Sequence, residues 1–234
     1  MQSLRLATMM LILLSFAAYK SFVGFDSLLI EPNSVRIFPR TYTHEIQLDF
    51  ENETANSLPN SFVSYIGGTG SAGVWKIVSD DTSPNGPLVI AQTSQDRTPV
   101  HFPILIFNSG IYSDARISTR IRPVDGNVDQ AGGIAFRFVD TGNYYVARIN
   151  ALENTVQLYK FLGSRMFPLA SIEVPVEHNK WHLLEVETFG PIIRCYYDGK
   201  LVIEKEDSSI QSGKAGFWTK SDSITYFDDF VIRK

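Results

Sequence analysis

Residues 131–150 read AGGIAFRFVDTGNYYVARIN, and this stretch indicates the fold class. Two runs rich in β-branched and aromatic residues flank the segment 140–143 (DTGN), whose composition is typical of a hairpin turn. If Asp140 pairs with Asn143, strand alternation gives three facing apolar pairs. These pairs are Phe138 with Tyr145, Phe136 with Ala147, and Ile134 with Ile149. We therefore expect an antiparallel hairpin whose apolar face points into a core.

The opposite face of this hairpin mixes cations with apolar side chains. It holds Ala135, Arg137, Val139, Tyr144, Val146 and Arg148, and Asn150 follows in phase. Such a mixture in the middle of a sheet suits ligand binding. The alternative is an ordinary solvated face on which the arginine stems cover apolar neighbours. The sequence leaves both interpretations open.

Short β-type runs continue on both sides of this hairpin, from His44 to the end of the chain. Asp198-Gly199 separates IIRCYY from KLVIEK, and a two-residue Asp-Gly loop predicts a hairpin with a type I′ turn. No helical period of useful length follows residue 43. Many short strands joined by Gly, Asp, Asn and Pro predict an all-β sandwich or barrel over residues 44–234.

The N-terminal segment has the pattern of a targeting sequence. Arg5 precedes an apolar run from Met9 to Ala18, and Ser15 and Ala17 are small residues suited to a cleavage site. We expect a signal peptide over 1–17 and an exported protein, with an uncleaved anchor as the alternative. Because the apolar run is too short to span a bilayer, we expect no membrane span in the mature chain. Residues 18–43 lack periodicity and are interpreted as a linker or a loosely attached arm.

Charge and cysteine content exclude several classes of protein. The 234 residues carry 21 Lys and Arg against 25 Asp and Glu, so the basic surface of a nucleic-acid-binding protein is absent. The single cysteine, Cys195, cannot form an intramolecular disulfide and lies in a strand pattern. We interpret Cys195 as a small buried apolar residue and not as a nucleophile.

Four stretches together resemble a known family: VDQAGGIAFRFVDTGNYYVARINALENTVQLYKF, NKWHLLEVE, YYDGKLVIE and GKAGFWTKSDSITYFDDFVI. They look like concanavalin A-like jelly-roll domains. Among these, they are similar to exported bacterial domains of the 3-keto-disaccharide hydrolase (3-keto-glucoside lyase/hydratase) family, relatives of family-16-like glycoside hydrolases. Counting the earlier segments SLPNSF and GVWKIVSDDTSPNGPLVIAQT, the likeness covers roughly residues 48–232. It implies a sandwich of two curved antiparallel sheets with a saccharide ligand on the concave one.

A late strand adds an aromatic side chain to the candidate binding face. In the run GFWTK, alternation places Trp218 and Lys220 on one face, opposite Phe217 and Thr219. If that face is shared with Arg137, Arg148 and Asn150, an indole platform lies beside several hydrogen-bond donors, as sugar binding requires. The alternative is that Trp218 is a core aromatic.

The sequence lacks the catalytic pattern of a family-16 retaining glycosidase. That pattern, E-x-D-x-x-E, is absent, and Glu185 and Glu187 have no aspartate between them. The chemistry implied by the resemblance is elimination from a 3-keto-glycoside, which needs a general base and stabilisation of an enolate. The candidates for the base are His101, Glu153 and Asp222, and those for the anion stabiliser are Arg137, Arg148 and Lys220. The sequence does not show whether these residues share one site.

Jelly-roll carbohydrate domains often hold a structural Ca²⁺ between their first and last strands. The residues suited to this divalent metal are Asp49 or Glu51 near the start of the domain and Asp228 or Asp229 near its end. The alternative is a hydrogen-bonded pair of aspartates at a sheet edge. For the whole domain, three function classes stay open: a non-catalytic glycan-binding module, an enzyme acting on 3-keto-glycosides, and a surface domain that binds a protein.

Overall fold

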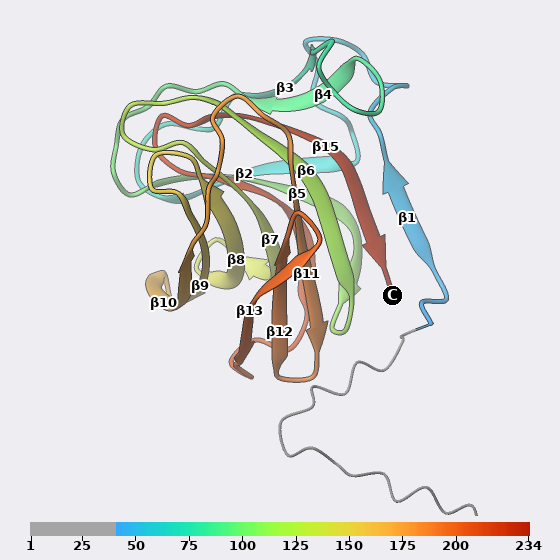
Figure 1. Cartoon of the computed structure of the whole chain (residues 1–234), viewed down its shortest axis with the longest axis vertical. Helices are drawn as coiled ribbons and strands as arrows, with labels where there is room; N and C mark the ends of the chain where they lie inside the picture. Colours follow the sequence, from blue (N-terminus) through green and yellow to red (C-terminus); the bar gives the residue numbers. More distant parts are fainter. Residues whose placement is uncertain (1–40) are drawn as a thin grey trace, which may run out of the picture. The chain divides into compact units, whose positions relative to one another are not determined.

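The computed structural model describes residues 41–234, which form a sandwich of two antiparallel sheets and contain no helix (Figure 1). The predicted all-β jelly-roll class is confirmed. The predictions for 1–17 and for most of 18–43 lie outside the described residues. No helix among residues 41–234 is long and apolar enough to cross a membrane.

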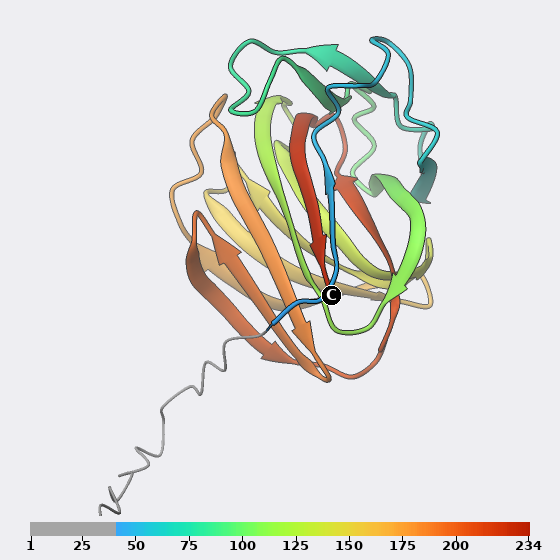
Figure 2. The ribbon, with the colours of Figure 1, turned by 90° about the vertical axis from the view of Figure 1, so that its right-hand side faces the viewer.

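The first sheet, named sheet A, has the strand order β13-β12-β11-β6-β15-β4-β3, and β1 also pairs with β15 (Figure 2). Its strands are β1 (Glu45–Leu48), β3 (Trp75–Ser79), β4 (Leu88–Gln92), β6 (Arg116–Asp125), β11 (His182–Phe189), β12 (Ile192–Tyr197), β13 (Lys200–Glu206) and β15 (Ile224–Arg233). The backbone of Thr43 and His44 also bonds to Lys234, so the start and the end of the described chain are held together.

The second sheet, named sheet B, has the order β10-β9-β8-β7-β14-β5-β2. Its strands are β2 (Phe62–Gly68), β5 (His101–Tyr112), β7 (Ala131–Asp140), β8 (Asn143–Asn150), β9 (Thr155–Leu162), β10 (Arg165–Glu173) and β14 (Gly213–Thr219). Strand β2 was not expected from the sequence. It is an edge strand whose alternation is weak and whose last residues are two glycines.

The main core lies between the two sheets and is rich in aromatic side chains. Phe217 of sheet B meets Phe227 and Phe230 of sheet A, with ring centroids 4.7 and 4.9 Å apart. Each such fully buried side chain contributes about 1.5–3 kcal/mol to folding. Cys195 is fully buried in the same core, and burial raises the pKa of its thiol to about 12. Its interpretation as a buried apolar residue is confirmed.

The hairpin that indicated the fold forms, but its register differs from the predicted one. Asp140 pairs with Asn143 as expected, yet Phe136, not Phe138, lies opposite Tyr145. The reason is a bulge between Phe136 and Asp140, where β7 carries two residues more than β8 and Arg137 has a positive φ of 46°. Phe138 is therefore turned to the face opposite the core, where it belongs to a second aromatic cluster.

The second predicted hairpin forms as expected. Asp198 and Gly199 have φ values of 45° and 78°, as a type I′ turn requires, and Tyr197 pairs with Lys200 across it.

Candidate functional site

The face of sheet B that points away from the core is concave. Phe102 on β5 and Phe161 on β9 have ring centroids 5.2 Å apart, although three strands separate them in the sheet. Neighbouring strands lie about 4.8 Å apart, so these rings meet only because the sheet curls toward this face. Tyr65 on β2 and Phe138 on β7 meet in the same way, at 5.2 Å.

One end of this concave face, named here the aromatic end, is filled by its own side chains. Trp218 stacks on Phe102 at 5.5 Å, its indole N–H donates to the Tyr144 hydroxyl at 3.3 Å, and Tyr144 stacks on Phe161 at 4.4 Å. Only 1% of Trp218 is exposed. Trp218 does point to the predicted face, but its indole packs against neighbouring rings and offers no free platform.

The other end, named here the polar end, is organised around the buried carboxylate of Asp129, which precedes β7. It contacts Arg148 at 3.3 Å and Lys220 at 2.6 Å, and it accepts a hydrogen bond from the Asn150 amide at 2.8 Å. Three residues predicted for the binding face, Arg148, Asn150 and Lys220, are thus brought together. The aspartate that joins them was not predicted.

Arg148 is the most enclosed cation of the polar end, with 4% of its side chain exposed. Besides Asp129, it donates to Glu153 at 3.0 Å and to the Gln157 side-chain oxygen, and it lies over the ring of Tyr159. Burial disfavours its charge, but these partners outweigh burial and raise the pKa of Arg148 above its usual value. Its Nε is buried without a hydrogen-bond partner.

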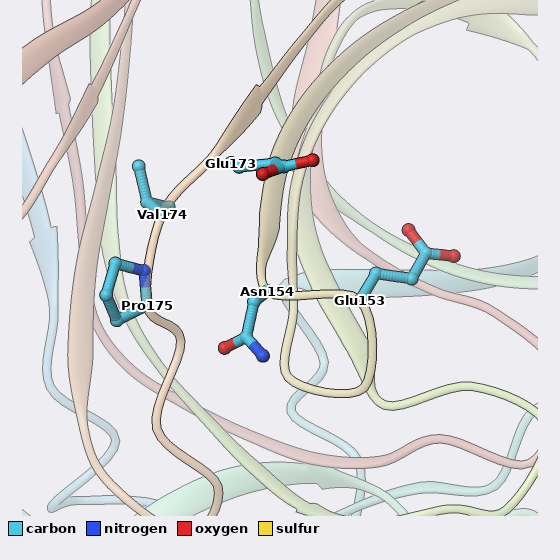
Figure 3. Close-up of a pocket in the computed structure, with 5 residues that line it drawn as sticks. All are labelled: Glu153, Asn154, Glu173, Val174 and Pro175. Carbon is cyan, nitrogen blue, oxygen red and sulfur yellow. The ribbon is translucent and has the colours of Figure 1, made fainter.

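A pocket of about 390 Å³ adjoins the polar end. Its lining residues are Glu153, Asn154, Glu173, Val174 and Pro175 (Figure 3). The turn that carries Glu153 is fixed because the Asn150 side-chain oxygen accepts the N–H groups of Leu152 and Glu153. Asn154, at a φ of 52°, accepts the N–H of Val174 at 2.9 Å through its carbonyl and thereby holds the opposite wall.

Glu173 joins the same face through strand register. Ser171 lies opposite Gln157, and Glu173 lies opposite Thr155, two residues further along both strands. The Gln157 amide donates to the Ser171 hydroxyl at 3.2 Å. In Figure 3 the side chains of Glu153 and Glu173 extend to the same side of the pocket, whereas Val174 and Pro175 lie on the other.

Asp222, a candidate base, serves instead to hold the loop that carries Asp129. Its carboxylate accepts the backbone N–H groups of Asn127, Val128 and Asp129 at 2.9–3.1 Å. Burial alone raises the pKa of Asp222, but these three donors outweigh burial and hold it below its usual value. A carboxylate so stabilised in its charged form is a poor proton acceptor.

His101, the second candidate base, is fully buried and engaged on both sides of its ring. Its Nδ1 lies 3.1 Å from the carbonyl oxygen of Ser221, and its Nε2 lies 2.7 Å from that of Ser71. These contacts join two loops. Of the three candidate bases, only Glu153 keeps a substantially exposed carboxyl group, with 41% of its side chain accessible.

Arg137 does not belong to the concave face, and the prediction that placed it beside Arg148 is corrected. Its guanidinium donates to the carbonyl oxygens of Ser113, Gly190 and Ile210, and the side chain is 2% exposed. The bulge at Arg137 breaks the alternation on which the prediction depended. Burial lowers the pKa of Arg137 below its usual value.

Each of the four carboxylates predicted to bind calcium accepts hydrogen bonds from its own donors. The Asp49 carboxylate accepts a hydrogen bond from the backbone N–H of Glu51, and the Glu51 carboxylate accepts one from the N–H of Leu88. Asp228 accepts a hydrogen bond from the Ser83 hydroxyl. Asp229 accepts hydrogen bonds from the side chains of Asn85 and Arg120. Burial, with the charges of Asp229 and Glu51, raises the pKa of Asp228 to about 7. Within residues 41–234, no three His, Cys, Asp or Glu side chains gather as metal ligands. The calcium site stays a prediction.

Sequence reasoning missed four members of the polar end: Asp129, Gln157, Tyr159 and Glu173. Gln157 pairs with Arg148 across β8 and β9, so extending the hairpin argument through the turn at 151–154 would have found it. Tyr159 follows in phase on the same strand. No signal of this kind exists for Asp129, whose position depends on the contact of its loop with Asp222.

Comparisons with known proteins agree with this architecture. No family model matches the chain. Levanase of Bacillus subtilis (strain 168) is 32% identical over 112 residues, which is 47% of this chain and 16% of levanase. The chain therefore spans about a sixth of that relative.

Solved structures share the fold. Carbohydrate-binding module CBM66 from Bacillus subtilis has a TM-score of 0.57 at 24% identity, with 68% of this chain and 95% of that one covered. The carbohydrate recognition domain of Emp47p has a TM-score of 0.54 at 12% identity, with 80% and 94% covered. These likenesses support the jelly-roll part of the predicted resemblance. The finer resemblance to 3-keto-disaccharide hydrolases stays a prediction, and the chain is similar to sandwich domains of the carbohydrate-binding kind.

Proposed function

We propose that residues 41–234 act as a saccharide-binding module whose ligand occupies the polar end of the concave face and the adjoining pocket. The observation that carries this proposal is Arg148. It is almost fully buried, ion-paired to Asp129 and Glu153, has an unpartnered Nε, and lies beside a pocket of about 390 Å³. Desolvating such an ion pair is costly, and its position beside a pocket supports a role in recognition.

The lining of the pocket suits the two chemical sides of a sugar. Glu153 and Glu173 are exposed acceptors for hydroxyl groups, and Lys220, a quarter of whose side chain is exposed, is a donor at the rim. Val174 and Pro175 supply an apolar wall for C–H groups. Because the turn and the loop that carry these groups are held by hydrogen bonds, little ordering is needed on binding.

The similarity to levanase suggests which saccharide to test first. That relative is named for activity on levan, and the matched stretch covers only part of it. Export, predicted from residues 1–17, would bring the module to polysaccharides outside the cell.

Cleavage of 3-keto-glycosides is the second candidate, and one observation favours it. Glu153 is an exposed carboxyl group in contact with Arg148, an arrangement in which a base and an anion stabiliser are adjacent. Against it, Arg148 and Lys220 are both already paired with Asp129, which reduces the charge they can offer to an enolate.

The test is affinity electrophoresis and calorimetry with levan, other neutral polysaccharides and a 3-keto-glucoside. We expect retention by a neutral polysaccharide without turnover, and an affinity about ten-fold lower in Glu153→Ala, in line with loss of one well-placed hydrogen bond to a charged group. Glu206→Ala, on β13 of sheet A, is the matched control. Binding of no saccharide by the wild-type protein would refute the proposal, and turnover of the 3-keto-glucoside would favour the enzyme.

A further inference from the structure

The cations of the polar end are already neutralised within the protein. Asp129 contacts both Arg148 and Lys220, and Glu153 contacts Arg148 a second time. Glu173 adds a further carboxylate on the same face, and it is exposed. Two positive charges therefore face three negative ones, and the charged groups that line the pocket itself are the carboxylates of Glu153 and Glu173.

Building on the proposed function, we propose that this site selects uncharged saccharides over uronates and other acidic sugars, with Glu153 and Glu173 as the specificity-determining residues. A hydroxyl group can donate to either carboxylate, whereas a ligand carboxylate placed there meets a like charge. Val174 and Pro175, on the other wall, offer no charged group to offset that repulsion.

Arg148 is not available to receive an acidic sugar in place of its present partners. A ligand carboxylate that took the guanidinium would have to displace Glu153 or Asp129. Displacing Asp129, which is 1% exposed, would leave a buried charge with fewer partners, and this is strongly unfavourable. Lys220 is held by the same carboxylate at the rim and does not line the pocket.

The carboxylates of Glu153 and Glu173 differ in how firmly the protein holds them, and this difference suggests different roles in binding. The Glu153 carboxylate accepts from Arg148 at 3.0 Å and from the Thr155 hydroxyl at 3.2 Å, so one of its oxygens is fixed toward the protein. Glu173 is fixed by its backbone register with Thr155 and is exposed. We infer that Glu153 orients the sugar and that Glu173 supplies most of the repulsion of acidic ligands.

The experiment compares one neutral saccharide that binds with the same saccharide after oxidation of its primary hydroxyls to carboxylates, by calorimetry at low and at 0.5 M salt. We expect the oxidised form to bind about ten-fold more weakly at low salt, from like-charge repulsion at close range. We also expect the difference to shrink at high salt, because salt screens exposed charges. In Glu173→Gln the ratio of the two affinities should fall toward one, whereas in Glu206→Gln it should stay at the wild-type value.

The possible outcomes distinguish the proposal of saccharide binding from the proposal of selection against acidic sugars. Equal or tighter binding of the oxidised form by the wild-type protein overturns the inference and leaves saccharide binding standing. A preference for the neutral form that survives in both Glu173→Gln and Glu153→Gln overturns the assignment of these residues. Failure to bind either form, in protein shown to be folded by its denaturation transition, refutes the proposed function itself.

Discussion

The aromatic end and the polar end of the concave face lie on the same strands, but one is packed with aromatic rings and the other is built from charged groups. On β8, Tyr144 and Val146 belong to the aromatic end, and Arg148 and Asn150 follow in phase at the polar end. At the aromatic end, side chains from distant strands meet ring to ring and exclude solvent. At the polar end, a comparable degree of burial is reached with charged groups, one of which keeps an unpartnered nitrogen. The first arrangement maintains the curl of sheet B, and the second leaves hydrogen-bonding capacity at a pocket.

Truncation at the aromatic end should have the largest effect on stability. Trp218→Ala removes a fully buried indole, so we expect the free energy of unfolding to fall by about 3–5 kcal/mol, as for other large-to-small core changes. Urea denaturation followed by circular dichroism measures this. Trp181→Ala, which truncates a half-buried tryptophan directly before β11, should cost much less. A Trp218→Ala protein of wild-type stability that had lost saccharide binding would show that the indole is a ligand platform after all.

Removal of Asp129 should be the most damaging change at the polar end. Asp129→Ala leaves Arg148 buried without its main counter-charge, and we expect a loss of about 3 kcal/mol in unfolding free energy. The double variant Asp129→Leu, Arg148→Met should be more stable than Asp129→Ala, because it removes both charges. If the double variant were clearly less stable than the wild-type protein, the pair would be a net source of stability and not a cost retained for recognition.

A smaller effect is expected from the tyrosine that lies under Arg148. Tyr159→Phe removes the hydroxyl that donates to Gln157 at 2.7 Å while keeping the ring below the guanidinium. We expect a loss of about 1 kcal/mol in unfolding free energy, typical of one hydrogen bond. Tyr65→Phe, on the aromatic side of the same face, is the control. It should change stability less, because the Tyr65 hydroxyl makes no hydrogen bond within residues 41–234 and the ring contact with Phe138 is kept.

The fold was largely predictable from the sequence, whereas the division of the concave face was not. Alternation and turn residues correctly gave the all-β class, the Asp198-Gly199 hairpin and the shared face of Trp218 and Lys220. Two features of the structure explain why the positions of Arg137 and Trp218 on the concave face could not be predicted. The bulge at Arg137 reversed the side-chain phase within a strand, and the curvature of sheet B brought rings of distant strands over Trp218. Neither a bulge position nor a curvature is encoded in local periodicity.

The weakest expected effect is that of acid on the polar end. The folded-state pKa of Asp222 is lowered, so its contribution to stability is present above the unfolded value near 3.8 and is lost as the pH falls below it. Saccharide affinity should therefore be constant from about pH 8 down to the unfolded value of Asp222 and fall only as the pH drops through its lowered folded-state pKa, when the loop 127–129 loosens. Calorimetry across this range measures the change. An affinity that declined already between pH 7 and 5 would indicate that a different group controls the site.

The most direct test of saccharide recognition at the polar end is an NMR titration of the ¹⁵N-labelled protein with the neutral saccharide that binds best. We expect the largest shifts at the amides of Glu153, Asn154 and Glu173, and an indole N–H signal of Trp218 that stays in place. If the Trp218 indole moved most and the amides around the pocket stayed unchanged, the ligand would occupy the aromatic end, and the assignment of the binding site would be wrong.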